Sequence, residues 1–185
     1  APRGLGDLII TEEVLRSLID AGMLYREDGT WRAKEGIESL RVPETVQGVI
    51  LSRVDRLEKD LQRVLESASV LGRLFRRRLL QHMDQEQTEL EKALWQLEER
   101  QLIYEERVLP EEEYSFQHVL TQETIYESIL RRRRAGFHQR VAEAIEALYG
   151  DGLEEFYEQL AYHYERTGSD EKATEYLLKA GEKSL

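Results

Sequence analysis

Cysteine is absent from the sequence, and only 3 of its 185 residues are proline. Without cysteine the chain can form neither a disulfide nor a cysteine-ligated zinc site, and it is compatible with a reducing cytosol. No apolar run approaches the roughly 18 residues that would span a bilayer. We therefore expect a cytoplasmic protein that has no membrane partner.

Motifs for catalysis and for nucleotide binding are also missing. A phosphate-binding loop has the form G-x-x-x-x-G-K-(S/T), and this sequence contains no Gly-Lys pair anywhere. Its four histidines lack metal-binding spacings such as H-E-x-x-H. Acidic neighbours such as Glu12 and Glu13 diverge around a helix, which does not suit paired acid and base catalysis. The sequence predicts no enzyme, no metal site and no cofactor bound by this chain alone.

Charge is abundant, and most of it is negative. The 37 acidic and 26 basic residues give a net charge of -11, so the chain should repel nucleic acid at long range. Charged residues make up 34% and apolar residues 41% of the sequence, which is typical of helices with amphipathic faces. Since the first residues contain neither a methionine nor a signal-peptide core, we expect a piece of a longer protein with two small helical units.

The most informative stretch is residues 114–138, where an alternating pattern gives way to a helical one. Residues 102–104 and 114–116 have the composition of two strands, and residues 109–112 supply a turn between them. Apolar residues then recur at helical spacing through Leu120, Ile125, Ile129 and Leu130. With a helix predicted from Leu90 to Leu97, the order is helix, hairpin, helix, which is typical of a winged-helix unit.

Other elements follow from apolar periodicity and from turn residues. A hairpin is predicted around residues 26–29, because Asp28-Gly29 tolerates positive φ. Proline at position 43 suits the opening of a helix, and Gly72 should end another. The remaining predicted helices lie at residues 11–22, 46–57, 61–71, 75–83, 137–148, 153–164 and 173–180.

The last two helices carry a recognisable pattern. Ala-x-His-Tyr (161–164) precedes a turn at residues 167–170, and Lys-Ala-x-x-Tyr-Leu-x-x-Ala (172–180) follows it. This pair resembles a tetratricopeptide repeat, and Tyr157 and Tyr164 are candidate contacts for a protein partner. One pair cannot bury both of its faces, so we expect further repeats beyond it. A simple terminal helical hairpin is the alternative.

Two groups of residues match a known family pattern. The first group is Phe116-Gln117-His118, Tyr126, Leu130, Arg133, His138, Ala142 and Glu146, and the second is Arg53, Asp55, Arg56 and Leu57. The first group resembles the edge of the winged-helix domain in the signal-transduction ATPases with numerous domains, in the bacterial branch found with nucleotide-cyclase, kinase or DNA-binding domains. The second resembles the R-(I/V)-D-x-L run of the same domain.

The resemblance implies a mostly α-helical chain with three parts. Residues 1–41 would be the tail of an upstream ATPase module, although residues 7–10 depart from the family pattern. Residues 42–135 would form the winged-helix domain with small β-hairpin wings, and residues 136–185 a helical linker with the first tetratricopeptide-like pair. The implied partners are the upstream ATPase domain, the downstream repeats and a protein ligand of those repeats.

The resemblance also implies a role for His118. In related ATPases the histidine that opens this helix contacts the β-phosphate of ADP, so His118 would bind nucleotide only together with the missing ATPase domain. A packing histidine is the alternative. The free N–H groups of a helix start favour an anion at this position.

The run Arg131, Arg132, Arg133 and Arg134 is a candidate for binding phosphate or another partner. At most two of these side chains can share one face of a helix, so solvated or internally paired arginines are the alternative. A DNA-binding winged helix is the second functional hypothesis, with a recognition helix at residues 88–100. Its acid-rich composition disfavours contact with a phosphate backbone.

Overall fold

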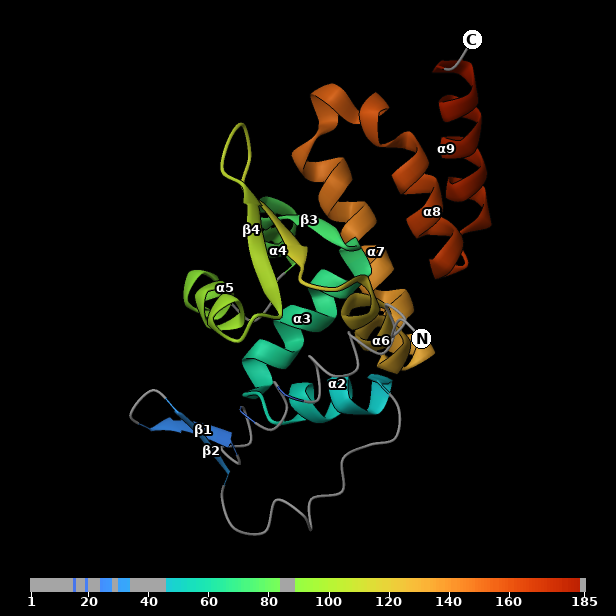
Figure 1. Ribbon diagram of the computed structural model, residues 1–185. Coiled ribbons are helices and arrows are strands. Elements are labelled where there is room, and N and C mark those ends of the chain that lie inside the picture. Colours follow the sequence, from blue (N-terminus) through green and yellow to red (C-terminus); the bar gives the residue numbers. More distant parts are fainter. Residues whose placement is uncertain are drawn as a thin grey trace, which may run out of the picture. The chain divides into compact units, whose positions relative to one another are not determined.

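The computed structural model describes residues 46–83 and 89–183, the strands at 24–27 and 30–33, and Leu15 and Ile19. This described part of the chain is mostly helical, with two small antiparallel sheets (Figure 1). The chain divides into two compact units, residues 1–62 and 63–185. No helix among the described residues is long and apolar enough to cross a membrane.

The described residues of the first unit form a hairpin, a helix and the start of the next helix. Strand β1 (Leu24–Glu27) pairs antiparallel with β2 (Thr30–Ala33), and Glu27 lies opposite Thr30. The hairpin predicted around residues 26–29 is therefore confirmed. Helix α2 (Val46–Asp55) follows and buries Val49, Ile50, Arg53 and Val54.

Some sequence predictions fall outside the described residues. The helix start predicted at residues 42–45 is one of them, and so is most of the helix predicted at residues 11–22. Leu15 and Ile19 within that range are helical.

The second unit begins within α3 (Lys59–Leu71), whose buried face includes Val64, Leu65 and Ala68. Gly72 follows with a φ of 121°. Residues that have a Cβ atom rarely adopt this backbone conformation, so glycine is suited to end the helix here. The predicted helix end at Gly72 is confirmed.

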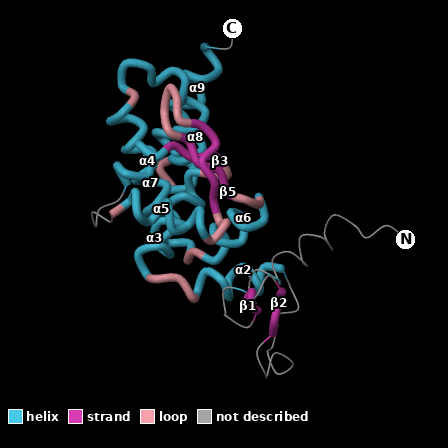
Figure 2. The backbone as a smooth tube through the Cα atoms, turned by 60° about the vertical axis from the view of Figure 1, so that its left-hand side comes forward, coloured by secondary structure: helices cyan, strands magenta, loops and turns pink. Residues whose placement is uncertain are grey.

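A three-stranded sheet follows, made of β3 (Leu74–Arg76), β4 (Ile103–Arg107) and β5 (Glu113–Phe116). The strand order is β3-β5-β4 with antiparallel pairing, and all four residues of the central strand β5 are buried. The predicted hairpin of β4 and β5 is confirmed. Figure 2 shows how small a part of the chain these strands form beside the helices.

Strand β3 corrects the prediction of a helix through residues 75–83. Only Arg77–Met83 are helical, as α4. Phe75 instead lies directly opposite Tyr114 in the sheet, with their rings stacked at 6.0 Å between centroids. A strand of three residues is too short to produce an alternating pattern, so the apolar spacing of α4 extended the prediction over it.

Helix α5 (Leu90–Glu99) is confirmed, whereas the next predicted helix is interrupted. Helix α6 (Val119–Ser128) ends before Ile129, which has an extended backbone with ψ of 127°. The Ser128 hydroxyl donates to the Ile125 carbonyl at 2.7 Å, an interaction that competes with helix continuation. Residues 129–130 are thus a break, and α7 (Arg131–Leu148) starts at the arginine run.

The chain ends in a pair of helices, α8 (Tyr157–Thr167) and α9 (Asp170–Lys183), which lie side by side (Figure 1). Gly168 turns the chain between them with a φ of 80°. Residues 150–156 form the 3-10 segment η2 (Gly150–Phe156), whereas the sequence predicted regular helix from Leu153. Gly152, inside η2, has a non-helical backbone (φ -138°, ψ 28°), so this segment is kinked there.

Candidate functional site

Helix α7 lies against both α4 and α8, so it connects the sheet-containing part of the second unit with the terminal helix pair. His138, near the middle of α7, contacts both sides. Its Nε2 atom lies 3.0 Å from the Tyr126 hydroxyl of α6, and its Nδ1 atom lies 2.8 Å from Nδ1 of His163 in α8. Tyr126, His138 and His163, hereafter the histidine cluster, therefore join three helices.

Both histidines of the cluster are 1% exposed. Burial, followed by the positive charges of Arg166 and Arg134, lowers the pKa of His138 to about 4. Burial, followed by repulsion from His138 and Arg166, lowers the pKa of His163 to about 3. Both rings are neutral at physiological pH, and one Nδ1 atom donates its proton to the other.

The cluster does not constitute a metal site. Among the residues that the structure describes, no group of three or more histidine, aspartate or glutamate side chains could hold a metal ion. Zinc sites in proteins use three or four such ligands. The contact between the two histidines is a buried hydrogen bond that positions α8 on α7.

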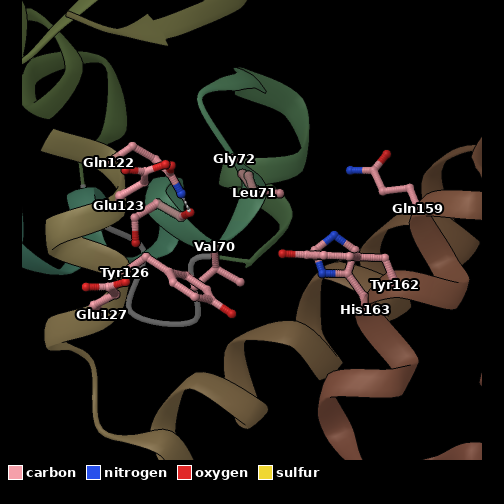
Figure 3. A pocket seen from close by; sticks show the side chains of 11 residues that line it. Val70, Leu71, Gly72, Gln122, Glu123, Tyr126, Glu127, Gln159, Tyr162 and His163 are labelled. Atoms are coloured by element: carbon pink, nitrogen blue, oxygen red, sulfur yellow. Dashed lines mark hydrogen bonds between the residues drawn. The ribbon is translucent and has the colours of Figure 1, made fainter. Parts of the chain in front are cut away.

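A pocket of about 410 Å³ adjoins the histidine cluster (Figure 3). Its walls are the end of α3 at residues 69–72, the side of α6 that carries Tyr126, and the side of α8 that carries Tyr162 and His163. Figure 3 shows the α6 and α8 side chains on opposite walls, with residues 70–72 between them. The volume lies within the range of small-molecule sites.

The chemistry of this pocket does not indicate catalysis. Its serine, Ser69, donates to the Glu66 carbonyl at 2.7 Å, while His163 is hydrogen bonded to His138. Gln122 donates to the Ser69 carbonyl at 2.6 Å and ties α6 to α3. The pocket therefore offers no nucleophile paired with a base.

The arginine run divides into two pairs. Arg133 forms an ion pair with Glu66 at 2.7 Å, and Arg134 lies over the Tyr126 ring at 4.6 Å while donating to the Tyr126 carbonyl at 3.3 Å. Arg131 and Arg132 are exposed on the first turn of α7. Within the run, two arginines are thus internally engaged and two are exposed to solvent, and contact of the run with a phosphate or a partner stays a prediction.

His118 lies at the start of α6, as the sequence predicted. It is the N-cap residue, with extended backbone (φ -131°, ψ 138°), and its side chain is half-buried. This side chain makes no capping hydrogen bond to α6. Contact with a nucleotide stays a prediction.

The two candidate contact tyrosines have different environments. Tyr164 is fully buried, and its ring stacks on Tyr176 at 5.8 Å between centroids. Its hydroxyl accepts a hydrogen bond from Lys172 at 2.8 Å. A buried ring that joins α8 to α9 does not suit contact with a partner, so only the half-buried Tyr157 keeps that role as a prediction.

The sequence did not predict the polar contacts between α7 and α9. Glu146 of α7 accepts hydrogen bonds from Tyr176 at 2.7 Å and from Lys172 at 3.2 Å, both in α9. Burial opposes its ionisation, but hydrogen bonds from Tyr176, Tyr164 and Lys172 lower the pKa of Glu146. A histidine or glutamate on an apolar helix face indicates a buried polar partner, but periodicity does not identify that partner.

No family model and no solved structure matches the chain. An uncharacterized protein of Rhizobium meliloti (strain 1021) is 38% identical over 71 residues, which cover 38% of this chain and 7% of that protein. The chain thus spans a small fraction of the relative's length. The described residues define a mostly helical protein with small antiparallel sheets.

Proposed function

We propose that this chain is a non-catalytic regulatory module of a multidomain bacterial signalling ATPase. It would couple the nucleotide state of an upstream ATPase domain to downstream repeats and an effector domain. The observation that carries this proposal is the element order α3, β3, α4, α5, β4, β5 with sheet order β3-β5-β4. A helical bundle with such a three-stranded sheet resembles a winged helix, in which β4 and β5 would be the wing.

The terminal helix pair supports the part of the proposal that concerns downstream repeats. Helices α8 and α9 are joined by a short turn and contact each other along their length, as in a tetratricopeptide repeat. On α9, Leu177 is 61% and Leu178 is 65% exposed. Adjacent exposed leucines suit a helix that a following repeat covers.

The coupling would run through α7. This helix contacts α4 on one side, and it is fixed to α8 by the His138–His163 hydrogen bond and to α9 by Glu146. A helix held on both sides transmits a displacement of one part to the other. ADP bound upstream would recruit His118 at the start of α6 and hold the resting state.

The comparison with the Rhizobium meliloti protein supports this proposal in one respect, which is the length of that protein. The matching 71 residues make up 7% of that relative. Sequence of this kind therefore occurs as a small part of a very long chain. Large multidomain chains are the setting that a regulatory module requires.

DNA binding, the alternative, receives less support. Four glutamates and one lysine, together with Trp95, Arg100 and Gln101, are exposed or half-exposed on and around α5. The loop before β5 is also engaged, because its Glu111 accepts a hydrogen bond from Tyr149 at 2.8 Å and lies 3.6 Å from Arg76 of β3. The acid-rich helix α5, and a loop before β5 that already contacts Tyr149, form a poor surface for a phosphate backbone.

Hydrogen exchange on the parent protein, with its ATPase domain present, tests the proposal. ADP should slow exchange at the first turn of α6, residues 118–122, because nucleotide contact and closure would protect these amides. Protection of residues 118–122 should be absent when the same 185-residue chain is mixed with ADP alone. If ADP leaves exchange unchanged throughout residues 63–185 of the parent, the coupling proposal is wrong.

A further inference from the structure

A second hollow of about 860 Å³, lined in part by His138, lies between the start of α7 and the turn after α8. Four arginines and one glutamate contribute to its lining, in a protein whose net charge is -11. The arginines come from two helices that are separate in sequence. The charged residues are Arg131, Arg132 and Arg134 from α7, and Glu165 and Arg166 from α8.

Little of this positive charge is neutralised by the side chains that the structure describes. In residues 46–83 and 89–183, neither Arg131 nor Arg132 forms an ion pair with another described side chain. Arg134 donates to a backbone carbonyl and lies over the Tyr126 ring, and it forms no ion pair with a carboxylate of the described residues. Arg166 pairs with its neighbour Glu165 at 3.2 Å, but both side chains are more than a third exposed, so this pair is weak.

Arginines from both helices affect the same residue, His138. His138 lines the hollow, and after burial the causes of its lowered pKa are the charges of Arg166 and Arg134. Arg133, in the same run, does not line the hollow and instead pairs with Glu66. The hollow thus collects three of the four consecutive arginines and adds one from α8.

We propose that this hollow binds a small anion that carries two or more phosphate groups. Guanidinium groups recognise phosphate oxygens through paired N–H donors, and they remain charged at all physiological pH values. Four of them provide more donors than a single carboxylate or phosphate can accept. The volume suits a ligand of small-molecule size. This site is separate from the nucleotide site predicted for the upstream domain, and it does not depend on the proposed function.

Nucleic acid fits the hollow less well. A duplex presents phosphates along an extended line, which requires a stripe of basic residues. Here the positive charge is confined to one hollow in an acidic chain, and Arg133 is already paired with Glu66. A compact polyphosphate can place all its charge within reach of Arg131, Arg132 and Arg166.

Titration calorimetry of the 185-residue chain with inorganic tripolyphosphate in 0.15 M salt is the test. Arg132→Gln and Arg166→Gln should each weaken binding about tenfold, which is typical for loss of a hydrogen bond between charged groups. Arg133→Gln, which removes the same charge one residue away, should change the affinity less than twofold. Melting curves of each variant check that the fold is retained.

Comparing tripolyphosphate with ATP and duplex DNA shows which kind of phosphate ligand the hollow binds. Similar affinities for ATP and tripolyphosphate would support recognition of the phosphate chain itself. The proposal is overturned if tripolyphosphate shows no saturable binding, or if Arg133→Gln weakens it as much as Arg132→Gln. Binding of ATP without tripolyphosphate, or of duplex DNA in preference to both, would also overturn it.

Discussion

His138 and His163 are hydrogen bonded through their Nδ1 atoms at 2.8 Å, and both rings are almost completely buried. At least one ring must be neutral to make this contact, because an imidazolium has a proton on each nitrogen and two imidazolium rings cannot bond to each other. The bond joins α7, which contacts the sheet-containing part, to the terminal helix pair. It therefore makes the packing of α8 on α7 sensitive to pH.

Stability should fall as the pH decreases from about 6.5 towards 4. Both histidines have a lower pKa when folded than their ordinary value of 6.5, so the unfolded chain binds more protons in this range. Each histidine then removes about 1.4 kcal/mol of stability per pH unit. Urea unfolding at pH 7.5, 6 and 5 measures this effect. Equal free energies of unfolding at pH 7.5 and 5 would contradict it, and the double substitution His138→Gln with His163→Gln should flatten the profile.

Tyr126→Phe should destabilise the chain by about 1 kcal/mol, because it removes the hydroxyl that lies 3.0 Å from Nε2 of His138. The aromatic ring and its edge contact with His138 would remain. Tyr104→Phe, at a half-buried position of β4, is the matched control and should change stability by less than 0.5 kcal/mol, roughly the limit for such sites. Equal effects of the two substitutions in urea unfolding would argue against the histidine cluster.

Glu146→Gln should lower stability by roughly 1–3 kcal/mol, because a neutral amide replaces a carboxylate that accepts bonds from Tyr176 and Lys172. Glu143→Gln, on the exposed face of the same helix, should have an effect of less than about 0.5 kcal/mol. Thermal unfolding of the two variants compares them directly. A larger loss for Glu143→Gln would show that Glu146 does not hold α9 on α7.

Two glycines should respond to alanine in opposite directions. Gly72 has a φ of 121°, so Gly72→Ala should cost at least about 1 kcal/mol through backbone strain. Gly136 lies inside α7 with open space around its Cα, so Gly136→Ala should add about 0.5–1 kcal/mol. Chemical unfolding of both variants gives the sign of each change. A stabilising Gly72→Ala would contradict the role of Gly72 as the end of α3.

The sequence predicted those elements that depend on residues close together in the chain. The helices at residues 61–71 and 90–97, the hairpin of β4 and β5, and the turn at Gly168 all follow from periodicity and turn chemistry. Strand β3 was missed because three residues carry no period, and it exists through pairing with β5. The break at residues 129–130 was missed because apolar spacing continues across it.

The candidate site was harder to predict than the fold. His118 was placed correctly at the start of α6, since helix starts have a sequence signature. The contact between His138 and His163 joins residues 25 positions apart on two helices, and neither residue indicates the other. The division of the arginine run likewise depends on Glu66, which lies on α3 and is distant in sequence.

The most direct test of the coupling proposal is the ADP affinity of the parent protein, with its ATPase domain, carrying His118→Ala. If His118 contacts an ADP phosphate, the substitution should weaken ADP binding by roughly 0.5–3 kcal/mol. The melting temperature of the 185-residue chain should change little, and His82→Ala, at an exposed position of α4, should leave ADP affinity unchanged. Unaltered ADP affinity together with a large fall in melting temperature would instead identify His118 as a packing residue and contradict the account.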